Sequence, residues 1–222
     1  IDADIFRLRD VQAHLREVNL GATAIGTGIN SKAAYQRKVI SNLREVTGVD
    51  YIAAGDLIEA TQDTGSFVHI SGMLKSVAIK VSKICNDLRL LSSGPRAGFN
   101  EINLPPMQPG SSIMPGKVNP VIPEVVNQVA FEVIGADMTI AMASEGGQLQ
   151  LNVFEPLIAY KLFTSINMMR RAFYSLGEKC VKGITANEEV CMENILNSVT
   201  LVTCLNPILG YEKSSALAKE AL

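Results

Sequence analysis

The stretch that most constrains the fold is the apolar run after Pro120 in this chain of 222 residues. Its large apolar side chains fall at positions that cover most of a helix circumference: Val125, Val126, Val129, Phe131, Val133, Ile134, Met138, Ile140 and Met142. A helix that is apolar all round has to be buried all round. Because one chain of this length supplies too little cover, we expect this helix to lie in a bundle formed by several subunits.

Helical periodicity recurs along the rest of the chain, and no alternation is long enough for a sheet. Further helices are predicted at residues 4–18, 31–47, 56–92, 157–182 and 187–203. We therefore predict an all-α protein with long central helices. Residues 1–182 are expected to form the central helical-bundle domain and residues 183–222 the start of a small C-terminal helical domain. Lys75 and Lys80 are interpreted as part of a solvated helix edge.

Composition excludes several classes of function. A net charge of −2 argues against a nucleic-acid-binding face. The four cysteines are widely spaced without a CxxC pair, which is typical of reduced thiols in a cytoplasmic protein. His14 and His69 are far apart in sequence, so we predict no metal site. No signal peptide and no membrane-length apolar run are recognised, so no membrane association is expected.

Residues 110–120, here called the serine loop, fit neither helix nor strand periodicity. Prolines and glycines interrupt regular hydrogen bonding throughout it, so we predict a loop. Its polar residues include Ser111, Ser112, Lys117 and Asn119. Its Gly and Lys suggest a phosphate-binding P-loop, but five residues instead of four separate Gly110 from Gly116, and Val118 follows the lysine.

The serine loop has the groups needed to remove a proton next to a carboxylate. A serine hydroxyl becomes a base only where its alkoxide is stabilised, and backbone N–H groups and the Lys117 ammonium are suitable donors. The same donors would stabilise an enediolate, while the Asn119 amide would hold a carboxylate. A mobile polar linker without chemistry is the alternative.

Residues 19–30, here called the Gly/Thr loop, form a second predicted polar loop. Three glycines and two threonines follow the first predicted helix. Composition favours a helix C-cap with a turn, and a loop that lines a pocket is the alternative.

The serine loop resembles the signature loop of the fumarase/aspartase superfamily of lyases. Residues 92–105 and the Gly/Thr loop are similar to other segments of that superfamily, and residues 120–129 and 147–152 resemble its aspartate ammonia-lyase branch. The resemblance covers essentially the whole chain.

The resemblance implies reversible elimination of ammonia from L-aspartate to give fumarate, with no organic cofactor and with Mg²⁺ activation in some members. It implies that Ser111 is the general base for the C3 proton and that Lys117 and Asn119 bind the substrate carboxylate. Ser112 and Met114 would close over the substrate. Supporting positions would be Glu124, which the family pairs with a histidine, and Thr23, Gly110 and Gly116.

The resemblance also implies a homotetramer whose active sites combine segments from three subunits. Two of these segments have no counterpart here, and both ends of the sequence are helix-forming. We therefore expect a fragment with little or no lyase activity alone. The alternatives are a fumarate hydratase and a non-catalytic helical assembly module.

Overall fold

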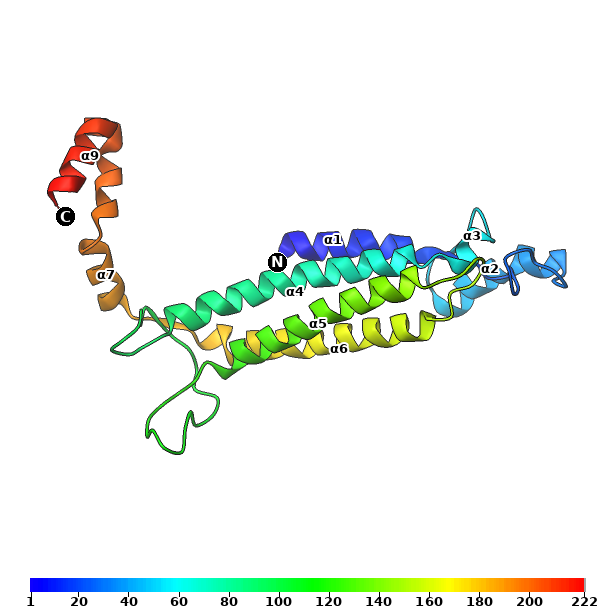
Figure 1. Ribbon diagram of the computed structural model, residues 1–222, viewed down its shortest axis with the longest axis horizontal. Coiled ribbons are helices and arrows are strands. Elements are labelled where there is room, and N and C mark those ends of the chain that lie inside the picture. Colours follow the sequence, from blue (N-terminus) through cyan, green and yellow to red (C-terminus); the bar gives the residue numbers. More distant parts are fainter. Residues whose placement is uncertain (222) are drawn as a thin grey trace. The chain divides into compact units, whose positions relative to one another are not determined.

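The computed structural model describes residues 1–221 and is predominantly helical (Figure 1). Its α-helices are α1 (Asp2–Gln12), α2 (Ala33–Thr47), α3 (Glu59–Gln62), α4 (Gly65–Leu91), α5 (Val121–Glu145), α6 (Glu155–Lys179), α7 (Glu188–Leu196), α8 (Asn206–Leu209) and α9 (Tyr211–Glu220). Short 3₁₀ turns are η1 (Ala13–Arg16), η2 (Val181–Gly183) and η3 (Val199–Leu205). The predicted all-α class is confirmed.

The strands within the described residues are only two residues long. β1 (Glu17–Val18) pairs in parallel with β2 (Ile52–Ala53), and β3 (Ile102–Asn103) pairs antiparallel with β4 (Thr185–Ala186). Each pair joins segments that are distant in sequence, so the strands connect helical segments by a few backbone hydrogen bonds. No periodicity signal predicts strands this short.

The chain divides into two compact units. Unit 1 contains residues 1–85 and 124–175, and unit 2 contains residues 86–123 and 176–222. The predicted domain boundary at residue 182 stays a prediction.

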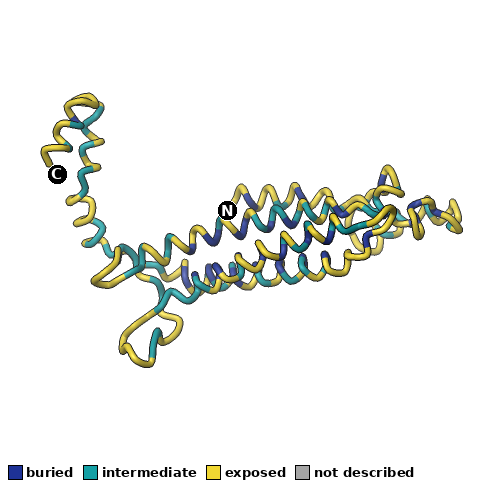
Figure 2. Tube along the Cα trace, in the orientation of Figure 1, coloured by how far each residue is buried: buried dark blue, intermediate teal, exposed yellow. Residues whose placement is uncertain are grey.

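In unit 1, portions of α4, α5 and α6 form a bundle, and buried positions recur along these helices (Figure 2). Small and β-branched side chains fill its core: Val77, Ala78, Val81, Val126, Ala130, Val133, Ile140 and Ile158. Polar groups also link α4 to α5. The Asn127 amide donates to the Ser82 hydroxyl at 2.8 Å, and both residues are buried.

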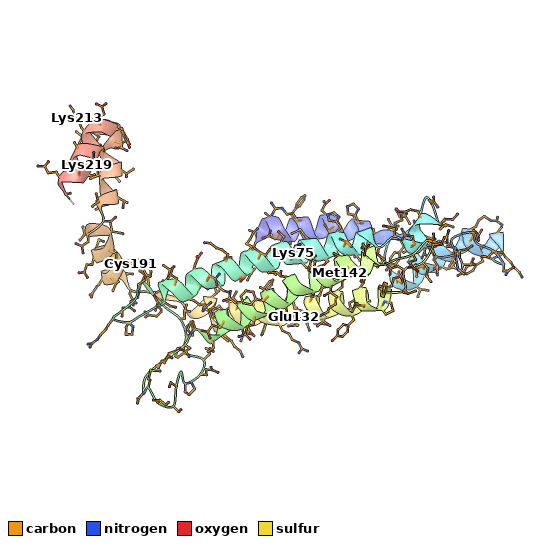
Figure 3. All side chains as sticks on the ribbon, viewed as in Figure 1. Lys75, Glu132, Met142, Cys191, Lys213 and Lys219 are labelled. Carbon is orange, nitrogen blue, oxygen red and sulfur yellow. The ribbon has the colours of Figure 1, made fainter. Side chains whose placement is uncertain are left out.

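Lys75 and Lys80 lie at a partly exposed helix edge, as predicted, but both also form ion pairs with neighbouring helices, which the prediction did not foresee. The Lys75 ammonium (Figure 3) binds Asp137 of α5, which also accepts a 2.7 Å bond from Ser71. The Lys80 ammonium lies 2.6 Å from Asp4 of α1. That hydrogen bond and the nearby positive charges hold the Asp4 pKa below its usual value of 3.8. Lysines reach across helix interfaces with their aliphatic stems, which spacing on one helix does not reveal.

Within this chain α5 is buried on one side only, as expected if one chain supplies too little cover for it; burial by further subunits stays a prediction. Its opposite side exposes large apolar side chains, and Met142 (Figure 3) is 67% exposed. By length and hydropathy α5 is also the one described helix that passes for a membrane span, a test that bundle helices of soluble proteins pass as well. Asn127 and Asp137 use polar groups on α5 to bind α4. These contacts identify α5 as a bundle helix.

Other predicted helix limits also need correction. The predicted helix 56–92 is broken between α3 and α4, because Asp63 adopts an extended conformation and its carboxylate accepts a bond from the Gly65 amide at 3.0 Å. The predicted helix 187–203 ends at Leu196, and Ser198 accepts from the Thr200 amide to start η3. Side chains that bond to a nearby backbone compete with helix continuation.

Candidate functional site

The serine loop holds the Ser111 hydroxyl between two backbone amides. Ser111 Oγ accepts hydrogen bonds from the Ile113 amide at 3.1 Å and the Met114 amide at 3.2 Å. Serine favours this local turn because its short side chain reaches the backbone two or three residues ahead. The arrangement provides the backbone donors that the sequence analysis required for a stabilised alkoxide.

The loop is closed at its base by its own atoms. The Gly110 amide donates to the Lys117 carbonyl at 2.8 Å, and the Asn119 side-chain amide donates to the Gly110 carbonyl at 3.3 Å. A Cβ on Gly110 would lie 2.2 Å from the Lys117 carbonyl oxygen, so this crossing accepts only glycine. Gly116 has a φ of +81°, which also favours glycine.

The predicted site residues of the loop are open to solvent. Ser111 is half-buried, whereas Ser112, Met114 and Lys117 are exposed. The Lys117 ammonium has no acidic partner among residues 1–221, so it remains free to bind an anion. The loop therefore presents a hydroxyl, a cation and an amide along one short, solvent-accessible segment.

The predicted site residues are divided between the two units. Those that unit 2 brings together are Gly110, Ser111, Ser112, Met114, Gly116, Lys117 and Asn119. Thr23 and Glu124 belong to unit 1. Thr23 is an exposed residue with a φ of +59°, and Glu124 lies in the first turn of α5.

The two histidines lie together despite their sequence separation. The His14 and His69 rings have centroids 5.1 Å apart and are tilted by 52°. Within residues 1–221 no cluster of three or more His, Cys, Asp or Glu side chains could hold a metal ion. The expectation that the protein needs no metal or organic cofactor stays a prediction.

None of the four cysteines, all among the described residues, forms a disulfide. Burial raises the pKa of the Cys180 thiol, which disfavours its reactive thiolate form. The prediction of reduced thiols stays a prediction.

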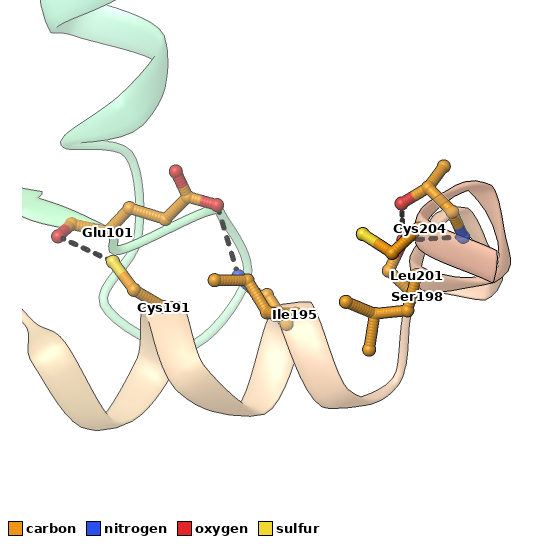
Figure 4. Close-up of a pocket in the computed structure, with 8 residues that line it drawn as sticks. Glu101, Cys191, Ile195, Ser198, Leu201 and Cys204 are labelled. Carbon is orange, nitrogen blue, oxygen red and sulfur yellow. Dashed lines mark hydrogen bonds between the residues drawn. The ribbon is translucent and has the colours of Figure 1, made fainter. Parts of the chain in front are cut away.

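Unit 2 also contains a cavity of about 400 Å³ that none of the predicted site residues lines (Figure 4). Its wall includes Glu101, Cys191 and Cys204. The Glu101 backbone oxygen accepts from Cys191 Sγ at 3.5 Å, and its carboxylate accepts from Asn194 at 3.1 Å. These contacts attach α7 to the segment that leads into the serine loop. The sequence analysis did not single out any of these residues.

The chain is similar in sequence to known lyases. Residues 1–135 match a family model described as Lyase. The chain is 63% identical over its whole length to the aspartate ammonia-lyase of Helicobacter pylori, covering 47% of that protein. It is 63% identical to that of Pseudomonas aeruginosa over 99% of this chain and 46% of that protein. The chain thus spans about half the length of the curated relatives it matches.

Solved structures of lyases also resemble this chain. The fumarate lyase:delta crystallin from Brucella melitensis, bound to cobalt, superposes with a TM-score of 0.93 at 55% identity. This comparison covers 99% of the present chain and 48% of the Brucella chain. The class II fumarase from Schistosoma mansoni gives a TM-score of 0.91 at 32% identity, over 99% of this chain and 50% of that one.

Proposed function

Because this chain belongs to the lyase family that its residues 1–135 match, we propose that it contributes the serine loop to an aspartate ammonia-lyase. The reaction would be the reversible conversion of L-aspartate into fumarate and ammonia. Ser111 would take the C3 proton, and the electrons left on C3 would move into the neighbouring carboxylate to form an enediolate. The C2–N bond would then break, and nitrogen would leave as ammonia.

The observation that carries the proposal is the pair of amides on Ser111 Oγ. Hydrogen bonds to an alkoxide favour the charged form and lower the pKa of the hydroxyl. A serine without such donors is too weakly ionised to act as a base.

Charge stabilisation would come from the same loop. The unpaired Lys117 ammonium is suited to the carboxylate on which negative charge develops. Asn119 uses a side-chain hydrogen to close the loop, and its amide has a second hydrogen for a substrate oxygen. Ser112 and Met114 would cover the bound substrate. Since protein groups supply both base and charge stabilisation, we expect no organic cofactor, and Mg²⁺ would at most activate.

The relatives favour L-aspartate over L-malate as substrate. The two aspartate ammonia-lyases named above are 63% identical to this chain, whereas the Schistosoma fumarase is 32% identical. A fumarate hydratase is therefore the second candidate.

The exposed apolar side of α5 supports a homo-oligomer. Phe131 and Met138 are 63% and 64% exposed on a helix that otherwise packs into a bundle. Covering this side with copies of the same helix would remove the apolar area from water. We propose a cytoplasmic homotetramer, as in the superfamily that the sequence resembles.

Ultraviolet absorbance of fumarate tests the proposed reaction. The test protein is a chain of the relatives' full length that contains these residues, here called the full-length form. Absorbance should rise with L-aspartate and stay flat with L-malate. A rise with L-malate alone would identify the hydratase, and no rise with either would favour the assembly module. The 222-residue chain alone should show little or no turnover, and full activity would contradict this expectation.

A further inference from the structure

Asn187 connects the C-terminal part of unit 2 to the segment that precedes the serine loop. Its side-chain amide donates to the Asn100 carbonyl at 2.7 Å. With Asn103 it forms a reciprocal pair, in which Asn187 Nδ2 donates to Asn103 Oδ1 at 3.2 Å and Asn103 Nδ2 donates to Asn187 Oδ1 at 2.6 Å. The Asn187 backbone amide also donates to the Glu101 carbonyl at 2.8 Å. One residue thus binds three of the four residues of segment 100–103.

The position of Asn187 in its own helix makes these contacts informative. It is the N-cap of α7, yet its side chain makes no capping hydrogen bond. An N-cap asparagine normally accepts a bond from an amide in the first helical turn. Here the side chain does not make that bond and donates hydrogen bonds to segment 100–103 instead. The contacts of the Asn187 side chain therefore do not serve to cap α7.

Segment 100–103 needs such an anchor. Asn100 has a φ of +49°, a left-handed conformation that few non-glycine residues adopt. Asn187 binds both its carbonyl and its side-chain oxygen. The β3–β4 pairing reinforces the segment. Two residues after Asn103, the Pro105 ring packs closely on the Gly183 backbone, since a Cβ on Gly183 would lie 2.5 Å from Pro105 Cγ.

A stiff connector joins this anchored segment to the serine loop. Pro105, Pro106 and Pro109 lie between Asn103 and Gly110. Proline fixes φ and keeps a short connector extended, so a shift at Asn103 is transmitted along it. Gly110 then fixes the base of the loop through the Lys117 carbonyl. The position of Ser111 thus depends on where segment 100–103 is held.

We propose that Asn187 is a positioning residue for Ser111, acting through Asn100, Asn103 and the proline connector. The inference rests on the proposed function for its catalytic consequence, because it names what aligns the proposed base. Misplacing a catalytic group by about 1 Å can cost roughly 100-fold in rate.

Hydrogen exchange in the 222-residue chain tests the positioning without any assay of activity. N187D is the informative variant, because aspartate caps a helix as well as asparagine does but cannot donate to Asn100 or Asn103. Amides of residues 107–118 should exchange about fivefold faster or more, while the helix content is unchanged. N197A is the matched control, since Asn197 is an exposed asparagine at the other end of α7. It should leave loop exchange unaltered.

Kinetics of the full-length form test the consequence. N187D should lower kcat about tenfold or more, with KM changed by less than about twofold, as expected for loss of alignment in the transition state. If N187D does not fold, Asn103→Ala removes the reciprocal pair from its other side and should give the same results.

The two proposals fail separately. Unaltered loop exchange in N187D, or an unaltered kcat in an active full-length form, would overturn the role of Asn187. Absence of lyase activity in the unsubstituted full-length form, together with faster loop exchange in N187D, would overturn the proposed function and leave the anchoring of the loop supported.

Discussion

The Gly/Thr loop and the serine loop have similar compositions but are held in opposite ways. In the Gly/Thr loop Gly21, Gly26 and Gly28 are buried. Side chains outside this loop contact it: Gln36 of α2 donates to the Gly21 carbonyl at 3.4 Å, and Thr61 of α3 accepts from Asn19 at 3.3 Å. Helical side chains therefore fix the Gly/Thr loop from outside.

Among residues 1–221 the serine loop has no such outside support beyond its base. Its hydrogen bonds join its own residues, and residues 112–118 are exposed. The contrast shows that loop glycines are buried where helical side chains contact them, although Thr23 and Thr27 of the same loop stay exposed. Where nothing covers the glycines, they make a turn that presents its side chains to solvent. The second condition suits a loop that has to bind and release a substrate.

The largest effect should follow from Gly26→Ala in the Gly/Thr loop. A Cβ there would lie 2.3 Å from the Ile58 Cα, and φ is +82°. We expect the free energy of unfolding to fall by about 3 kcal/mol, because backbone atoms have to move. Thermal unfolding followed by circular dichroism measures this. Gly48→Ala is the matched control, since Gly48 has a φ of +69° but open space around it, and it should cost only about 1 kcal/mol.

Gly110→Ala should show the reverse pattern in the serine loop. Its Cβ would meet the Lys117 carbonyl and open the base of the loop. We expect lyase activity of the full-length form to fall about 100-fold, with little change in melting temperature, because the loop contributes little buried area. Gln108→Ala, an exposed position in the connector, should leave both unchanged. A large loss of stability in Gly110→Ala would contradict the comparison.

Gln36→Ala should have a smaller effect on the Gly/Thr loop. It removes the bond to the Gly21 carbonyl and the contact with Gly28. The expected loss is about 1 kcal/mol, as for one hydrogen bond, and hydrogen exchange should increase at residues 21–28 but not at residues 110–118. Arg37→Ala, an exposed neighbour on the same helix, should alter neither loop. An equal increase in hydrogen exchange in both loops of Gln36→Ala would contradict the view that helical side chains hold only the Gly/Thr loop.

Acid should affect the helix that leads toward the Gly/Thr loop but not the serine loop. At neutral pH this should be the smallest of the predicted effects. Asp4 ties α1, which leads toward the Gly/Thr loop, to Lys80. Because its folded pKa is lowered, its contribution to stability is present above its usual pKa of 3.8 and is lost as the pH falls through the lower folded value. By contrast, the hydrogen bonds of Ser111 and Asn119 in the serine loop involve backbone amides and a backbone carbonyl rather than a carboxylate.

Melting curves against pH test the role of Asp4. The unsubstituted chain should be more stable than Asp4→Asn at neutral pH, and the two should converge in acid. Asp2→Asn, an exposed acid in the same turn, is the matched control for loss of a carboxylate other than the one that binds Lys80. Curves for Asp4→Asn that stay parallel to those of the unsubstituted chain would show that Asp4 does not couple to pH.

Local signals predicted the parts of the fold that local forces decide. Helix α2 ends at Thr47, the predicted limit, because Gly48 follows it in a left-handed conformation that glycine favours. The serine loop was predicted from its prolines and glycines for the same reason. By contrast, the break at Asp63 depends on a side-chain bond to Gly65 that competes with the helix.

Features that depend on distant contacts were missed. The meeting of His14 with His69 and the ion pairs of Lys75 and Lys80 depend on helix packing. Asn187 was missed because its partners lie more than eighty residues earlier. The only available signal was an asparagine at a helix start, which ordinarily indicates a cap. Composition likewise did not distinguish the covered Gly/Thr loop from the exposed serine loop.

Fumarate formation by Ser111→Ala in the full-length form, with its melting temperature recorded alongside, tests the central claim most directly. The alkoxide held by the Ile113 and Met114 amides is the proposed base, so turnover of L-aspartate should fall by about 10²–10⁴-fold at an unchanged melting temperature. Turnover retained within a few-fold, with the same fold, would contradict the account.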